Sequence, residues 1–197
     1  MRRIALALLC LSAAATSLHA ATLADEVVAA YGGRAALAKV HAVRESGTVV
    51  SMMRSGTGKT VRTFAYPDRL SVAIEYPQSS ELRVVSGARG WQNGKEASGA
   101  QLDAMALQAA RLNAARLLAE QPSSIRQDGA SKLVVTLPRG LTLALEIDPK
   151  THYIVHSAGT LTGGMATGDT TLTHVELNPA LDAAAFGPDA AAPRQRS

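Results

Sequence analysis

The feature that most constrains the fold of this chain is a series of short segments in which apolar and polar residues alternate. In residues 69–76, the clearest segment, one side carries Leu70, Val72, Ile74 and Tyr76. A period of two is that of a β-strand with one buried face. Turn-forming Gly, Pro, Asn and Asp separate such segments by a few residues, so neighbouring strands are expected to be antiparallel.

The same pattern locates the other strands. It predicts β-strands at residues 48–53, 60–66, 69–76, 81–86, 91–92, 132–137, 141–147, 153–162 and 170–177. Residues 56–58 and the pair Asn93 and Gly94 have the composition of hairpin turns. We expect the last two strands to pair with each other around the glycine-rich residues 163–168.

Apolar residues recur at helical spacing in two other places. Residues 23–43 predict two short helices, or one helix that is broken at Gly32 and Gly33. Residues 100–120 predict one long helix that ends before Pro122. Helices are the available cover for the apolar face of the strands. The sequence therefore predicts an α+β fold in which a curved antiparallel sheet wraps around helices.

The N-terminus predicts export. Arg2 and Arg3 precede an apolar run and a small-residue site at Ala20, which is typical of a secretory signal peptide over residues 1–20. No later segment is apolar for long enough to predict a transmembrane span. We expect a periplasmic protein.

Cleavage at this site would leave one domain over residues 21–189 and a disordered tail over residues 190–197, which is rich in Ala and Pro. It would also remove the only cysteine, Cys10, so packing alone would hold the domain. The formal charge of +4 falls by two when the signal peptide is removed. A charge this small, without a basic run, argues against nucleic acid as a partner.

No catalytic set emerges from the sequence, and we expect no cofactor and no metal. Gly58-Lys59-Thr60 fails as a phosphate loop because Met53 stands where the first glycine is needed. If the last two strands paired, His156 would face His174, and two histidines alone would hold a metal weakly. Two ordinary sheet histidines are the favoured interpretation of this pair.

The order of the elements and several local motifs resemble one known family. The quoted stretches are "ADEVVAAYGGRAALAKVHAVRESGTVV" (24–50), "YPDRLSVAIEYPQSSELRVVSGARGWQNG" (66–94), "LTLALEIDPKTHYIVHSAG" (141–159) and "TLTHVELNPALDAAAFGPD" (171–189). In this order they resemble the LolA/LolB-like superfamily of periplasmic outer-membrane lipoprotein-sorting carriers. Phe186 matches the aromatic anchor of the family's closing segment.

This resemblance implies a half-barrel of antiparallel strands with helices across its open side. Between them the family holds acyl chains in an apolar cavity during transport for outer-membrane biogenesis. The implied partners are a lipid or the acyl chains of lipoproteins, together with inner- or outer-membrane proteins. Shielding a chain from water is worth about 0.8 kcal/mol per CH₂, and this task needs no catalytic group.

On this basis we predict a non-enzymatic carrier or binding protein for a lipid or acylated ligand. The residues expected to line its cavity are Leu70, Val72, Ile74, Leu82, Val84, Trp91, Met105, Leu112, Leu143 and Leu145. Taken by themselves, Trp91 and the helical apolar stripe are better explained as ordinary core than as ligand contacts. Two alternatives stay open: an envelope protein-interaction or stress-sensing module of the same fold, and a small envelope hydrolase that uses the region of His156 and His174.

Overall fold

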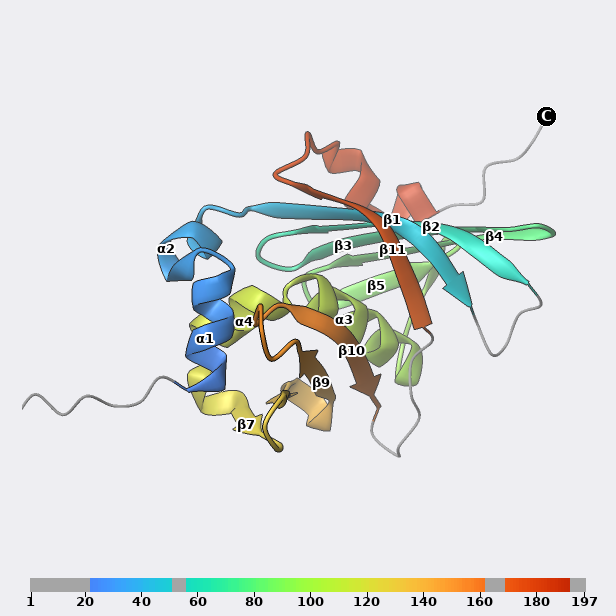
Figure 1. Ribbon diagram of the computed structural model, residues 1–197. Coiled ribbons are helices and arrows are strands. Elements are labelled where there is room, and N and C mark those ends of the chain that lie inside the picture. Colours follow the sequence, from blue (N-terminus) through green and yellow to red (C-terminus); the bar gives the residue numbers. More distant parts are fainter. Residues whose placement is uncertain (1–21, 51–55, 162–168, 192–197) are drawn as a thin grey trace, which may run out of the picture.

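The computed structural model describes residues 22–50, 56–161 and 169–191 (Figure 1). The α-helices in this part of the chain are α1 (Leu23–Ala30), α2 (Gly33–Ala38), α3 (Ala100–Leu112) and α4 (Ala114–Glu120). The β-strands are β1 (Ala42–Val50), β2 (Thr57–Ala65), β3 (Arg69–Tyr76), β4 (Ser79–Ser86), β5 (Arg89–Gln92), β6 (Lys95–Glu96), β7 (Ile125–Gln127), β8 (Lys132–Thr136), β9 (Thr142–Ile147), β10 (Ile154–Thr160) and β11 (Asp169–Leu177). Short 3-10 helices are η1 (Pro122–Ser124), η2 (Pro138–Gly140), η3 (Ala183–Phe186) and η4 (Pro188–Ala191).

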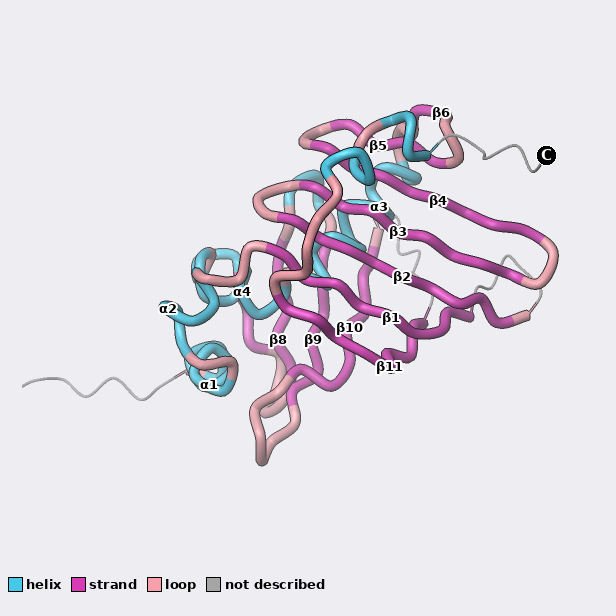
Figure 2. Tube along the Cα trace, turned by 90° about the horizontal axis from the view of Figure 1, so that it is seen from above, coloured by secondary structure: helices cyan, strands magenta, loops and turns pink. Residues whose placement is uncertain are grey.

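All of these strands pair in antiparallel fashion, and their hydrogen bonds divide them into two sheets. The large sheet has the order β11-β1-β2-β3-β4-β5-β6, and the small sheet has the order β10-β9-β8-β7. Figure 2 shows β11 at one edge of the large sheet, next to β1, and β6 at the other. The predicted α+β architecture with antiparallel strands is confirmed, but the strands form two sheets instead of one.

Helix α3 lies between the two sheets and contacts strands of both (Figure 1). Met105 and Leu112 pack in the core of the large sheet with Phe64. Leu107 points the other way, into a cluster with Leu141 and Leu161. A helix with apolar residues on two faces is buried on both sides, which explains why this short helix can join two sheets.

The prediction that the last two strands pair with each other in a hairpin is wrong. β10 pairs with β9, and β11 pairs with β1 across the whole length of that strand. The turn residues 163–168 lie outside the described residues. β1 begins at Ala42, well before the expected start at residue 48. The first part of the strand was missed because Arg44, Glu45 and Ser46 interrupt its apolar pattern. The longer β1 provides the partner edge that β11 uses.

The long helix expected over residues 100–120 is interrupted at Asn113, which has φ −105° and ψ 5°. Apolar spacing continues from Leu112 to Leu117, so the pattern did not reveal the break. Asn favours a helix less than Ala or Leu does, because its side chain competes for hydrogen bonds. Here the Asn113 side chain accepts a hydrogen bond from the hydroxyl group of Tyr66.

Two local predictions near the glycines are confirmed. Gly32 and Gly33 have φ of 90° and 83°, a left-handed conformation that glycine adopts readily, and they separate α1 from α2. Asn93 and Gly94 have φ of 50° and 79° and form the tight turn between β5 and β6. Gly58, in contrast, was expected in a turn and lies within β2.

The C-terminal segment covers the outer face of the large sheet. Phe186 is buried against Ala42 and Ala65, and Ala190 packs on the cluster of Val84 and Trp91. The described residues of this segment end at Ala191, in η4.

Within residues 22–50, 56–161 and 169–191, no helix combines the length and the apolar character needed to cross a lipid bilayer.

Candidate ligand-binding cavity

A cavity of about 770 Å³ lies where the β11 edge of the large sheet meets the small sheet and the helices. Residues of β1 and β2 form one wall, β10 and β11 form two more, and α2 and the junction of α3 with α4 complete it. In the described part of the chain β10 pairs only with β9, and β11 pairs only with β1. The cavity therefore lies between two free sheet edges, the orange strands of Figure 1.

An ion pair stands on the inward face of the large sheet and lines this cavity. The register of β1 and β2 places Glu45 opposite Arg62, and Arg62 Nη2 lies 2.6 Å from Glu45 Oε2. Their side chains are only 14% and 7% exposed. Burial raises the pKa of Glu45, while the nearby charges of Arg62 and Arg111 act in the opposite direction. A charge at an inward strand position is costly without a partner, so removing either residue alone would destabilise the folded protein.

A second arginine approaches from α3. Arg111 lies in the last turn of that helix, and its Nη2 donates a hydrogen bond to the carbonyl oxygen of Ser157 in β10 at 2.9 Å. Both residues line the cavity. This bond connects the helix between the sheets to the free edge of the small sheet, and it fixes a guanidinium group in the cavity wall.

The side chain of Tyr66, which directly follows β2, connects that strand to the break between α3 and α4. The hydroxyl group of Tyr66 donates a hydrogen bond to Asn113 Oδ1, and the guanidinium of Arg116 lies 4.0 Å from the centre of the Tyr66 ring. Arg116 also donates to the carbonyl oxygen of Val40 at 2.9 Å and pairs with Glu120. Burial raises the pKa of Tyr66 to about 12, so the phenol stays neutral at ordinary pH.

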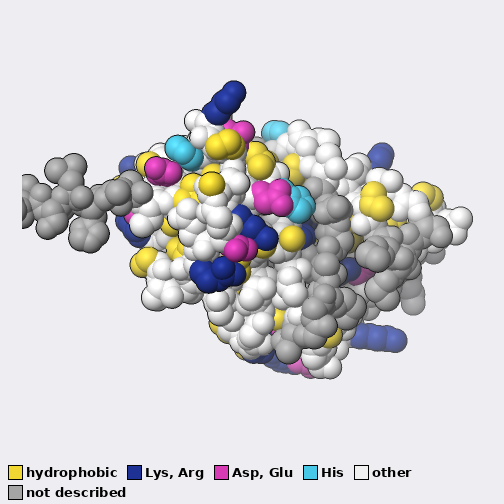
Figure 3. Space-filling model, turned by 60° about the horizontal axis from the view of Figure 1, so that its bottom comes forward, with side chains coloured by type: hydrophobic (Ala, Val, Ile, Leu, Met, Phe, Trp, Pro, Cys, Tyr) yellow, Lys and Arg dark blue, Asp and Glu magenta, His cyan; other side chains and the backbone are white. Residues whose placement is uncertain are grey.

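The outer part of the cavity is apolar and accessible to water. Val155 on β10 is 64% exposed, and Leu177 on β11 is 60% exposed. Leu172 and Val175 on β11 are also exposed and line the same space. We call these four residues the apolar rim. Figure 3 shows apolar side chains beside acidic and basic ones on one face of the molecule.

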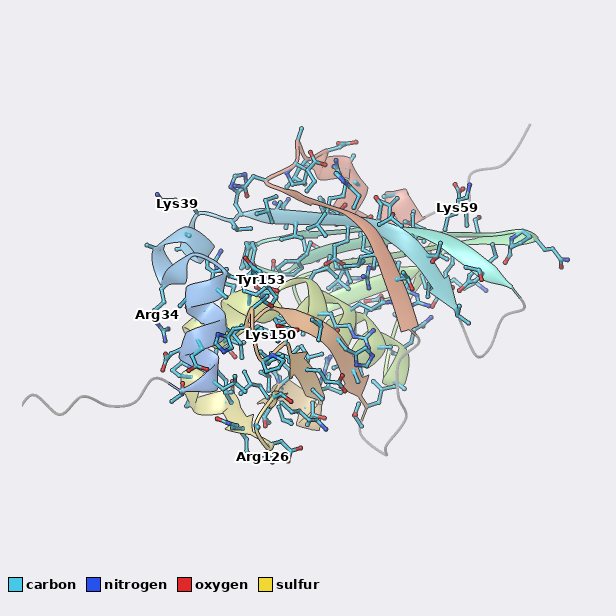
Figure 4. All side chains as sticks on the ribbon, viewed as in Figure 1. Arg34, Lys39, Lys59, Arg126, Lys150 and Tyr153 are labelled. Carbon is cyan, nitrogen blue, oxygen red and sulfur yellow. The ribbon has the colours of Figure 1, made fainter. Side chains whose placement is uncertain are left out.

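Helix α1 holds the start of β10 in place. The Ile154 N–H donates a hydrogen bond to the Tyr31 hydroxyl group at 3.4 Å, and the rings of Tyr31 and Tyr153 meet edge to face at 5.2 Å. Figure 4 shows Tyr153 where β10 begins, beside α1. Burial raises the pKa of Tyr31.

The structure distributes the ten predicted lining residues over three regions. The first region is the core of the large sheet, which contains Leu70, Val72, Ile74, Met105 and Leu112. The second is the core under α1 and α4, which contains Leu143 and Leu145. The third is the cluster beneath η4, which contains Leu82, Val84 and Trp91. They do not form one wall, and of the ten only Leu112 lines the cavity of about 770 Å³.

The physical reason is strand register, which a single strand does not reveal. Val85 lies opposite Leu70 and shares its inward cluster, so Val84 points to the other face together with Trp91. The residues missed were polar ones: Glu45, Arg62, Tyr66, Arg111, Asn113 and Arg116. One signal was present, because Arg62 is in phase with the apolar Phe64 on the same strand.

His156 and His174 do not face each other, because the hairpin on which that alignment depended is not formed. His156 lies opposite Glu146 in the small sheet, and His174 lies opposite Ser46 in the large one. Within the described residues no group of three or more His, Cys, Asp or Glu side chains could hold a metal ion.

Comparison with known proteins finds no protein-family model and no curated protein that matches this sequence.

Proposed function

We propose that this protein is an exported, non-enzymatic carrier or binding protein for a lipid or an acylated ligand. In this proposal residues 1–20 direct export to the periplasm and are removed. In the same proposal the two sheets, with helix α3 between them, take the roles of the half-barrel and its cover in the LolA/LolB-like carriers that the sequence resembles.

The observation that supports this proposal is the cavity of about 770 Å³ with its apolar rim. Sites for small molecules commonly have volumes of about 300–1,000 Å³ and mostly apolar walls. Exposed Val and Leu side chains on two free sheet edges offer a hydrocarbon chain an entrance as well as a wall. Each CH₂ group buried there would contribute about 0.8 kcal/mol to binding.

The first test is native mass spectrometry of protein purified from the periplasm, combined with uptake of a fluorescent fatty acid. The proposal predicts co-purified acyl species, or uptake of the probe by protein from which lipid has been extracted. Absence of both would contradict it.

A matched pair of variants localises the binding. Ala36 and Ala35 are both exposed on α2, but only Ala36 lines the cavity. Ala36→Trp should fill part of the cavity and weaken uptake of the fatty acid, whereas Ala35→Trp should leave it unchanged. Equal uptake by both variants would place the ligand elsewhere.

The exposed edge of β11 favours a second candidate function, that of a module for protein interaction. A free strand edge with apolar side chains can pair with an extended segment of a partner. In that case Ala36→Trp would leave partner binding intact, while Leu177→Asp would abolish it. The hydrolase alternative uses the region of His156 and His174, which lie in different sheets of this structure.

A further inference from the structure

The charges in the cavity wall indicate which kind of ligand it holds, an inference that rests on the proposed function. The described lining contains three guanidinium groups, those of Arg62, Arg111 and Arg116, and a single carboxylate, that of Glu45. Glu120, outside the lining, pairs with Arg116, so Arg62 and Arg111 together outweigh Glu45 by one positive charge. The hydroxyl groups of Tyr31 and Tyr66 add neutral hydrogen-bonding groups. An excess of positive charge in a partly enclosed, low-dielectric space attracts anions much more strongly than the same charges would at an open surface.

The charged and apolar groups lie at different depths. The Arg62 side chain is 7% exposed and lies on the inward sheet face, whereas Val155 and Leu177 of the apolar rim are at least 60% exposed. An amphiphile that follows this gradient would place its polar end at the buried arginines. Its hydrocarbon would then extend along the rim.

We propose that the cavity binds an amphiphile with an anionic head, a carboxylate or a phosphate, which enters first and contacts Arg62 and Arg111. A guanidinium group has five N–H donors in a planar fork and can share them between two anions. Arg62 already holds Glu45 through Nη2, and Arg111 holds the Ser157 carbonyl oxygen through Nη2. A ligand oxyanion would be a further acceptor for each group.

Glu45 sets the specificity of this arrangement. Its negative charge next to Arg62 opposes a second anion, so the bound state favours Glu45 in its neutral form, which can donate a hydrogen bond to the ligand. Burial shifts the pKa of Glu45 in the direction that this requires. Glu45→Gln should therefore tighten the binding of an anionic amphiphile and leave a neutral one unaffected.

The experiment is a calorimetric titration of the lipid-extracted protein with dodecanoate and, separately, with its methyl ester, each below the concentration at which it aggregates. The two compounds share a hydrocarbon chain and differ in charge. Loss of hydrogen bonds to charged groups typically weakens binding by tenfold or more. We expect dodecanoate to bind at least about tenfold more tightly than the ester.

Variants assign the effect to the arginines. Arg111→Gln should remove most of the preference for dodecanoate, while Arg126→Gln should preserve it. Arg126, labelled in Figure 4, is the matched control because it lies on β7, is absent from the cavity lining, and has 66% of its side chain exposed. The comparison of acid and ester on the unaltered protein stays decisive even if Arg111→Gln fails to fold.

The outcomes separate the two proposals. Equal affinity for dodecanoate and its ester would overturn the inference of an anionic head and leave the carrier proposal standing. No binding of either compound would overturn both. Dodecyl phosphate distinguishes the two head groups: the proposal predicts that it, too, binds more tightly than the ester, and weaker binding than the ester would restrict the site to carboxylates.

Discussion

Glu45 on β1 and Arg62 on β2 form a close ion pair, 2.6 Å between oxygen and nitrogen, on the face of the large sheet that points toward the helices. The same face carries Val43 and Phe64, which pair two positions further along the register. The cavity thus owes its polar floor to two residues at positions where the alternation of these strands would otherwise place apolar side chains.

The first prediction concerns the stability of this pair. Arg62→Met should lower the free energy of unfolding by about 3–5 kcal/mol, because it leaves the buried Glu45 without its partner. The double variant Glu45→Gln, Arg62→Met should lose about 1 kcal/mol or less, because no buried charge remains. Urea denaturation followed by circular dichroism measures both. Equal losses in the single and double variants would show that the pair is not coupled.

The second prediction concerns Tyr66 at alkaline pH. Burial raises its pKa from 10.0 to about 12 in the folded protein, so the folded state binds this proton more tightly than the unfolded state does. The resulting stability is fully present below pH 10 and is lost as pH rises through about 12. Because the ring is partly exposed, we discount the contribution to about 1 kcal/mol.

The measurement is the free energy of unfolding from pH 9 to pH 12 for the unaltered protein and for Tyr66→Phe. Over this range the unaltered protein should lose about 1 kcal/mol more free energy of unfolding than Tyr66→Phe does. The reason is that a phenylalanine ring at this position cannot ionise. Parallel curves would contradict a shifted pKa for Tyr66.

The third prediction tests the pairing of β1 with β11. This pairing places β11 in the large sheet, whereas β10 belongs to the small sheet. A Cβ atom on Gly47 would lie 2.1 Å from the carbonyl oxygen of Thr171, so Gly47→Ala should destabilise the protein by more than about 2 kcal/mol. Gly187→Ala is the matched control, since its nearest neighbour would be 3.7 Å away. Thermal unfolding compares them, and a harmless Gly47→Ala would mean that β11 does not pair here.

The fourth prediction separates core residues from cavity residues. Leu143 is fully buried beneath α1 and α4, so Leu143→Ala should cost about 2–5 kcal/mol of stability and leave the affinity for dodecanoate unchanged. Leu177→Asp at the exposed rim should weaken the affinity for dodecanoate and leave the stability almost unchanged. If Leu143→Ala weakens binding while the protein stays folded, the ligand occupies the core cluster instead.

Strand positions could be predicted from the sequence wherever alternation was regular. The expected strand at residues 69–76 matches β3 at both ends, and the turn at Asn93 and Gly94 is confirmed by its left-handed backbone. These features depend on local periodicity and turn chemistry, which a single segment contains. β1 was only partly predicted because Arg44 and Glu45 interrupt its apolar pattern.

The pairing between distant strands could not be predicted from the sequence in the same way. Whether Val84 or Val85 faces the helices depends on its register against Leu70, and the partner of β11 lies more than a hundred residues earlier in the chain. Of the ten apolar residues chosen for the binding site, only Leu112 lines the candidate cavity, whose wall also contains Arg62, Arg111 and Glu45.

The most direct test of the central claim is methyl NMR of the lipid-extracted protein with a spin-labelled fatty acid. We predict strong broadening of the methyl signals of Val43, Leu112 and Leu177, which line the cavity. The signals of Leu133 and Leu143, which lie in the core under α1 and α4, should stay sharp. Equal broadening of both sets, or none at the cavity residues, would contradict a ligand held between the free edges of β10 and β11.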